Sequence, residues 1–232
     1  MILASPSHLF TCFCIRGEGG VGTAFAFNHG STTFFLTAAH VLGGAALGSF
    51  VYLKRPSDWL RCELSEVRPH PSGCDASMFS IKGLEVEVDH HFTHRDDPKL
   101  HLGDELKFTG FPHGLENTAA SPLGFSTPLV RTAFFSGVVV DKVSGASLLI
   151  LDGLNNPGYS GGPVWSSGAE ASRPHLLGLI SGYRVEERGK SRVYEALPEG
   201  AERALENMFV KPNSGMIHAI PYADLAQLIN SV

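Results

Sequence analysis

The sequence lacks any long hydrophobic run, and no apolar stretch approaches the ~18 residues that a membrane-spanning helix needs. It also lacks a basic block, because its 18 Lys and Arg are scattered and are outnumbered by 23 Asp and Glu. The net charge of −5 gives no electrostatic reason to expect nucleic acid or an anionic membrane as a partner. We therefore expect neither a nucleic acid nor a membrane among its partners.

Cysteine is scarce as well, with four residues in a chain of 232. Cys12 and Cys14 would point the same way on a strand, while Cys62 and Cys74 stand alone. An even count permits two disulfides. However, residues 1–8 have no cationic region and do not resemble an export signal. We therefore favour reduced, buried thiols and a cytoplasmic location.

Short runs of β-branched and aromatic residues, separated by Gly, Pro, Ser and Asn, dominate the chain. Such a pattern is typical of an all-β barrel or sandwich. We expect twelve strands, at 9–15, 22–27, 33–37, 50–53, 60–67, 76–81, 105–110, 130–141, 148–151, 162–165, 176–182 and 215–220.

Three segments depart from the strand pattern. Residues 221–231 begin with a proline and carry apolar residues on one helical face, which predicts a C-terminal helix. Residues 184–213 are rich in charge and form an insertion, within which Ala201, Ala204, Leu205 and Met208 have the spacing of a short helix. The insertion is either a partner-binding lid or a surface loop.

The third segment, residues 89–97, is rich in His and Asp. Its composition would suit a metal site, but nothing assigns it to a helix and it lies between the two strand-rich halves. We favour a solvated linker, and we predict neither a metal site nor a cofactor.

The stretch GYSGGPV at residues 158–164 places Ser160 between glycines, directly before an apolar strand. Glycines allow a tight turn that brings backbone N–H groups close to a ligand. A serine in such a turn can attack a carbonyl, and the neighbouring amides can hold the oxyanion that forms. Taken alone, the serine is more simply a turn residue.

Two distant stretches supply what a nucleophilic serine needs. TAAH at 37–40 ends on His40, a candidate base, and DASMF at 75–79 begins with Asp75, a candidate carboxylate to orient that base. Each residue alone has an ordinary structural explanation. Their joint occurrence, each in a distinct local context, favours nucleophilic serine catalysis.

The same motifs resemble those of trypsin/chymotrypsin-like serine proteases, and most closely the catalytic domain of bacterial HtrA/Deg-type enzymes. The similar stretches are GTAF at 22–25, FLTAAHV at 35–41, DASMF at 75–79, LGD at 102–104, GFPHG at 110–114, the segment 152–163, GLISG at 178–182 and GMIHAIP at 215–221. The resemblance spans nearly the whole chain in the right order, without the PDZ domain that HtrA-type enzymes carry.

The resemblance implies a chymotrypsin-like fold of two six-stranded antiparallel β-barrels with a C-terminal helix. Residues 1–100 would form the barrel that carries His40 and Asp75, and residues 101–232 the barrel that carries Ser160, together making one protease domain. Ser160 would be the nucleophile, His40 the base and Asp75 its orienting carboxylate. The backbone N–H groups of Gly158 and Ser160 would form the oxyanion hole.

Tyr159 departs from the family. Trypsin-like zymogens carry Asp at this position, which pairs with a newly cleaved N-terminus, and HtrA-type domains commonly carry Asn. We therefore expect no activation by cleavage, and the departure raises the question of what holds the serine loop in its working conformation. We interpret residues 112–127, with two prolines and two glycines, as a mobile loop beside the active site, and the resemblance implies that such a loop serves activation, as in Deg-type enzymes.

The resemblance also implies the substrate site. Leu154 would lie at the floor of the primary specificity pocket, with Tyr183 and Gly215 at its walls, and Ser181 and Gly182 on the strand that pairs with the substrate backbone. None of the pocket residues is acidic, which favours an apolar or small side chain before the scissile bond.

These inferences together predict an intracellular bacterial serine endopeptidase with a regulatory, stress or defence role, acting on protein or peptide substrates. A regulatory partner could bind at 184–213. The alternative is a catalytically silent pseudoprotease whose groove beside Ser181 and Gly182 binds an extended peptide as an added strand.

Overall fold

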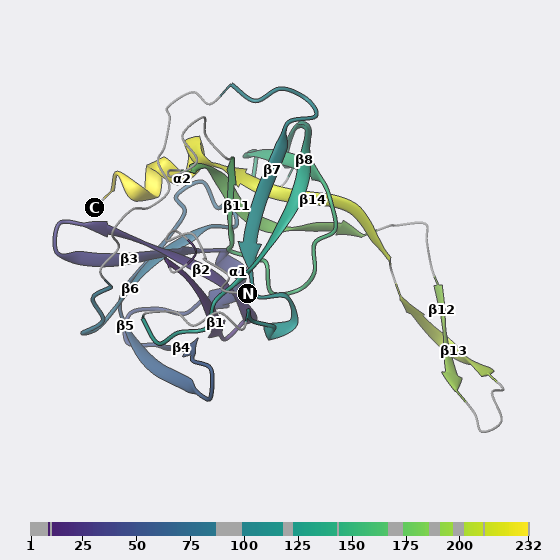
Figure 1. Cartoon of the computed structure of the whole chain (residues 1–232), viewed down its shortest axis with the longest axis horizontal. Helices are drawn as coiled ribbons and strands as arrows, with labels where there is room; N and C mark the ends of the chain where they lie inside the picture. The colour runs from purple at the N-terminus through teal and green to yellow at the C-terminus, as the bar shows by residue number, and fades with distance from the viewer. Residues whose placement is uncertain are drawn as a thin grey trace, which may run out of the picture.

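Twelve strands close into two antiparallel barrels of six strands each in the computed structural model (Figure 1). The structure describes residues 9, 11–86, 99–117, 123–142, 144–166, 174–185, 191–196, 202–210 and 212–231. The fold predicted from the sequence, a chymotrypsin-like double barrel with a C-terminal helix, is confirmed.

The first barrel has the strand order β1-β2-β3-β6-β5-β4. Its strands are β1 (Cys12–Gly17), β2 (Gly20–His29), β3 (Thr32–Thr37), β4 (Phe50–Lys54), β5 (Trp59–Pro69) and β6 (Ser77–Ile81). Its interior holds large aromatic side chains, since Phe13, Phe35 and Phe79 are all at most 1% exposed. Phe35 and Phe79 face each other across β3 and β6 and stack with their ring centroids 5.2 Å apart.

The second barrel has the strand order β10-β11-β14-β9-β8-β7. Its strands are β7 (Glu105–Gly110), β8 (Leu129–Val140), β9 (Ser147–Asp152), β10 (Pro163–Ser166), β11 (His175–Val185) and β14 (Asn213–Pro221). A single 3-10 turn, η2 (Pro112–Gly114), follows β7. The fully buried residues Phe108, Leu151, Val164, Ile180 and Ile217 form its interior.

Two helices complete the fold. The one-turn helix α1 (Ala39–Leu42) follows β3, and α2 (Tyr222–Ile229) follows β14 at the C-terminal end. Leu225 and Leu228 on α2 are buried in the same apolar cluster as first-barrel side chains, so α2 joins the two barrels. The carbonyl of Asp224 on α2 also lies 2.9 Å from Nε2 of His70 at the end of β5.

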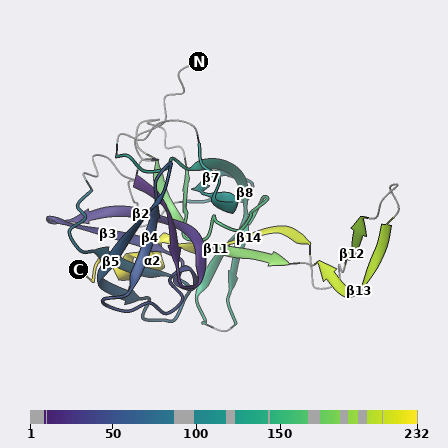
Figure 2. The ribbon, with the colours of Figure 1, turned by 90° about the horizontal axis from the view of Figure 1, so that it is seen from below.

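The insertion forms an antiparallel hairpin of β12 (Ser191–Ala196) and β13 (Glu202–Val210), which projects away from the barrels in both views (Figures 1 and 2). The short helix predicted around Ala204, Leu205 and Met208 is therefore wrong. Its i, i+3, i+4 spacing indicates helix only as a weak local preference, and pairing of the segment with β12 satisfies the backbone hydrogen bonds instead.

All four cysteines are free and buried, as the sequence predicted. The His- and Asp-rich segment 89–97 lies outside the described residues. Among the residues that are described, no group of three or more His, Cys, Asp or Glu could hold a metal ion. No helix in the described part of the chain has the length and hydrophobicity needed to cross a membrane.

Candidate active site

His40 and Asp75 meet at the end of the first barrel that faces the second. His40 lies on α1, directly after β3, and Asp75 precedes β6, the neighbour of β3 in the sheet. Nδ1 of His40 lies 2.8 Å from Oδ2 of Asp75, and the backbone N–H of His40 donates to Oδ1 of the same carboxylate at 2.9 Å. Because a carboxylate only accepts, Nδ1 carries the proton and Nε2 is left as the basic nitrogen.

This contact changes the acidity of the imidazole. The hydrogen bond that His40 donates to Asp75 raises the pKa of His40 above its usual 6.5, against the opposing effect of partial burial. The ring remains accessible, with half of the His40 side chain exposed. His40 is therefore both oriented by Asp75 and open to a proton-donating neighbour.

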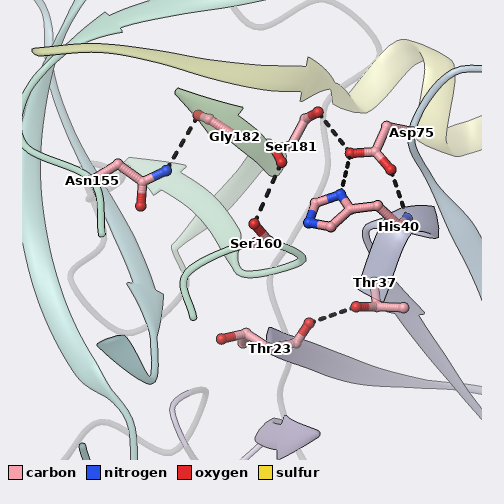
Figure 3. A network of polar contacts seen from close by, with 8 residues as sticks. All are labelled: Thr23, Thr37, His40, Asp75, Asn155, Ser160, Ser181 and Gly182. Atoms are coloured by element: carbon pink, nitrogen blue, oxygen red, sulfur yellow. Dashed lines mark hydrogen bonds and ion pairs between the residues drawn. The ribbon is translucent and has the colours of Figure 1, made fainter. Parts of the chain in front are cut away.

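The Ser181 hydroxyl, from β11 of the second barrel, donates to Oδ2 of Asp75 at 2.9 Å (Figure 3). Its carbonyl accepts a long hydrogen bond of 3.5 Å from the Ser160 hydroxyl. Ser181 thus contacts both the carboxylate and the serine, and Figure 3 shows His40, Asp75 and Ser160 gathered around it. In this arrangement the Ser160 hydroxyl points to the Ser181 carbonyl.

In the loop before Ser160, hydrogen bonds hold the carbonyl groups of the residues that precede Gly158 and Ser160. The Pro157 carbonyl accepts from the backbone N–H of His113 at 2.7 Å, and the Tyr159 carbonyl accepts from Gly162 at 2.8 Å. In a trans peptide the N–H points opposite to the carbonyl. The two contacts therefore fix the directions of the N–H groups of Gly158 and Ser160, and neither N–H donates a hydrogen bond within the described part of the chain.

Thr23 on β2 joins this loop to the first barrel. Its hydroxyl donates to the Gly158 carbonyl at 2.7 Å and accepts from the backbone N–H of Phe111 at 3.3 Å, while its own N–H donates to the Ser160 carbonyl at 2.8 Å. Gly158 itself has φ +107°, and a Cβ there would lie 2.1 Å from the Phe111 carbonyl oxygen. Only glycine fits both the backbone angle and the space.

The residues predicted to bind substrate lie around the same loop. Leu154 follows β9 and is 53% exposed, and Ser181, Gly182 and Tyr183 lie along β11. Gly215 lies on β14, and its carbonyl accepts from the N–H of Gly153 at 2.9 Å. Their roles toward a substrate stay predictions.

Asn155, which sequence reasoning did not single out, ties this region together. Asn155 is 1% exposed. Its side-chain NH₂ donates to the Gly182 carbonyl at 3.2 Å, and its backbone carbonyl accepts from the side-chain NH₂ of Asn213. Asn155 therefore fixes the distance between the serine loop and β11. Only its burial in the fold reveals this, because an Asn in a Gly- and Pro-containing loop is usually a turn residue.

On the other side of Gly158 lies an open cavity of about 420 Å³. It is lined by Val21, Lys54, Trp59, His113, Gly114, Pro157 and Gly158. Side chains from the β4–β5 hairpin of the first barrel therefore face the serine loop across this cavity.

Comparison with solved structures finds the same fold in several proteins, among them an HtrA-type protease. The chain is similar to Rv3671c from M. tuberculosis, in an inactive form with a serine-to-alanine mutation, with a TM-score of 0.59, 14% identity and coverage of 99% of this chain and 95% of that one. It is similar to the apo MamO protease domain from Magnetospirillum magneticum with a TM-score of 0.55, 15% identity and coverage of 97% and 96%.

The HtrA-type protease AlgW, solved with a tripeptide, matches with a TM-score of 0.59 and 16% identity, over 97% of this chain and 60% of that one. No protein-family model and no curated protein matches the chain. At these identities the likeness establishes the protease fold, and the chemistry has to be argued from the side chains of this chain.

Proposed function

We propose that the protein is a serine endopeptidase that hydrolyses peptide bonds of protein substrates through an acyl-enzyme intermediate. The single observation that carries the proposal is the Asp75–His40 pair, which leaves Nε2 of His40 basic beside Ser160 and the two oriented N–H groups. A groove that only bound peptides would need neither the base nor the nucleophile.

In the proposed reaction, a rotation of the Ser160 side chain turns its hydroxyl from the Ser181 carbonyl toward Nε2 of His40. Nε2 takes the hydroxyl proton as Oγ attacks the scissile carbonyl carbon. The carbonyl oxygen becomes an anion, which the N–H groups of Gly158 and Ser160 stabilise. Asp75 stabilises the imidazolium that forms.

The proton on Nε2 then passes to the leaving amine as the C–N bond breaks, which leaves an ester on Ser160. Water attacks this ester with His40 again as base, and the carboxylic acid product departs from Ser160. The acyl part of the substrate lies along Ser181 and Gly182 on β11, and the amine part runs toward the cavity beside Trp59.

A fluorophosphonate probe tests the proposal, because it reacts only with an activated serine. We expect the native protein to be labelled and to cleave a fluorescent casein substrate, and Ser160→Ala to abolish both. Ser65→Ala is a matched control, since Ser65 contacts Ser80 at 2.8 Å in the first barrel, away from the site. A native protein that is neither labelled nor active, but binds an extended peptide, would instead be a pseudoprotease.

A further inference from the structure

Arg131 contacts Leu154, the first residue of the serine loop, which comprises residues 154–160. It stands on β8, where it is the direct partner of Phe108 on β7. Its guanidinium donates from Nη1 to the Leu154 carbonyl at 2.6 Å. Directly opposed residues of an antiparallel pair point to the same face of the sheet. Arg131 and Phe108 can therefore contact the same neighbouring side chain.

That neighbour is Tyr159, the residue directly before Ser160. Its side chain is 1% exposed, and its ring packs edge-on against Phe108 with the centroids 4.9 Å apart. Gly110, two residues further along β7, makes room for it, because a Cβ there would lie 2.7 Å from Cδ1 of Tyr159. The hydroxyl end of the buried ring interacts with the Arg131 guanidinium.

We propose that Arg131 is a positioning residue that holds both ends of the 154–160 loop, through the Leu154 carbonyl and the Tyr159 hydroxyl, in the conformation that presents the Gly158 and Ser160 N–H groups. The inference rests on the proposed function. Contacts of the Arg131 side chain would then order this loop without the cleavage of the chain that activates trypsin-like zymogens.

A guanidinium suits this task because it carries several N–H donors in a rigid plane and stays charged at all relevant pH values. One Arg can therefore bind a carbonyl and a phenol at once, whereas the single ammonium of Lys reaches one of them well. Burial raises the pKa of Tyr159, so its hydroxyl stays protonated and neutral through the physiological range. The hydroxyl therefore remains able to donate and accept hydrogen bonds through that range.

Four variants test the inference. Arg131→Met keeps an unbranched apolar stem and removes both contacts, and Tyr159→Phe keeps the ring and removes the hydroxyl. Arg131→Lys is the conservative change, and the fourth variant combines Arg131→Met with Tyr159→Phe. The matched control is Lys107→Met, which removes a cation 5.5 Å from the Trp165 ring on the same β7–β8 pair, away from the loop. Fluorophosphonate labelling rate, kcat and KM on a cleaved peptide, and hydrogen exchange of residues 154–162 are measured below the unfolding temperature.

We expect Arg131→Met to lower the labelling rate and kcat at least tenfold, with KM within about twofold, and to lose amide protection over 154–162. Tyr159→Phe should lower the labelling rate severalfold, Arg131→Lys should fall between native and Arg131→Met, and the double variant should be no worse than Arg131→Met. Inhibition by phenylboronic acid, whose tetrahedral adduct places an oxygen near the two N–H groups, should weaken by the same factor as kcat/KM.

A native labelling rate in folded Arg131→Met, or a loss that Lys107→Met shares, would overturn the inference. Unchanged amide protection over 154–162 in Arg131→Met would overturn it as well. Hydrogen exchange does not require turnover, so it distinguishes this failure from failure of the proposed function, in which the native protein itself would neither label nor cleave.

Discussion

The backbone N–H of His113 donates to the carbonyl of Pro157 at 2.7 Å, and His113 does so with φ 53°. Within the described residues it is the one non-glycine residue in the left-handed region. Such a conformation costs about 1–2 kcal/mol for an L-residue. The strained residue is thus the one whose N–H sets the direction of the Gly158 N–H. This hydrogen bond joins the η2 turn to the loop before Ser160, so the two segments are ordered together.

The first prediction concerns this turn. His113→Pro removes the N–H donor and imposes φ near −65°, so the Pro157–Gly158 peptide loses its restraint. We expect the fluorophosphonate labelling rate to fall about 10²-fold or more, as for the loss of one oxyanion donor.

His113→Gly is the matched control, because it keeps the donor and adopts positive φ freely. It should retain labelling within about twofold, with little change in unfolding free energy, since relief of strain offsets the extra freedom of the unfolded chain. Equal labelling rates for the two variants would contradict the role given to this N–H.

The second prediction is a pH profile. His40 acts as a base only when neutral, so the labelling rate should rise as the pH passes the pKa of His40, which the Asp75 hydrogen bond raises above 6.5. Asp75→Asn removes that cause, so the midpoint should shift to lower pH while the plateau falls steeply, by about 10⁴-fold in related triads. A midpoint that stays in place in Asp75→Asn would show that another group controls the profile.

The raised pKa of His40 also makes the unfolding free energy depend on pH. A folded-state pKa above the unfolded value means that protonation of His40 adds stability, which is fully present below pH 6.5 and is lost as the pH rises through the folded pKa. By chemical denaturation, the difference in unfolding free energy between native and His40→Ala protein should therefore shrink as the pH rises through that pKa and then level off, because neutral His40 still donates from Nδ1 to Asp75. A difference that is constant with pH would contradict the linkage.

The barrels, and the three residues that meet around Ser181, could be predicted from the sequence because each leaves a local signal. Strands are short apolar runs between turn residues, and His40, Asp75 and Ser160 lie in recognisable motifs. The supports of the site leave no such signal. In the sequence, Arg131 is one charged residue within a predicted strand. Its partner across the sheet, Phe108, and the Leu154 carbonyl that it binds are each 23 residues away in the sequence.

The hairpin shows the opposite failure. Its second strand carries Ala204, Leu205 and Met208 at helical spacing, and the local preference for helix is worth only a few tenths of a kcal/mol per residue. Pairing with β12 provides hydrogen bonds along the segment and outweighs it. Long-range pairing decided the structure in both cases, and a single sequence does not display it.

The third prediction concerns the four thiols. Burial raises the pKa of Cys14 to about 12 and also raises that of Cys62 and Cys74, so the reactive thiolate is nearly absent at pH 8. Iodoacetamide should alkylate none of the four cysteines in the native protein within an hour and all four in denaturant, as read by intact mass. Rapid native alkylation, or a native mass lower by 2 Da per disulfide, would contradict the free and buried assignment.

The fourth prediction concerns the residue before the scissile bond. The pocket residues predicted from the sequence, including Leu154 and Tyr183, offer no carboxylate, so a cation in the pocket would gain no partner for its charge. Cleavage of a peptide library should favour apolar or small residues at this position, with Arg and Lys disfavoured by tenfold or more. Dominant cleavage after Arg or Lys would refute the pocket assignment.

The fifth prediction concerns Thr23, whose hydroxyl is buried between the Gly158 carbonyl and the Phe111 N–H. Thr23→Val keeps the shape and removes the hydroxyl, which leaves both partners buried and unpaired at a cost of about 1–3 kcal/mol. Both partners lie at Gly158, one on the residue itself and the other on the neighbouring Phe111, so we expect the labelling rate to fall about 10–100-fold together with stability.

Thr33→Val is the matched control for Thr23→Val. Thr33 is also a buried threonine whose hydroxyl bonds a backbone group, the N–H of Val86 at 3.0 Å, but it lies in the first barrel away from Ser160. It should lose similar stability and keep the native labelling rate per folded molecule. If the two variants lose labelling equally, Thr23 supports the fold alone, and the Gly158 peptide is held by His113 without it.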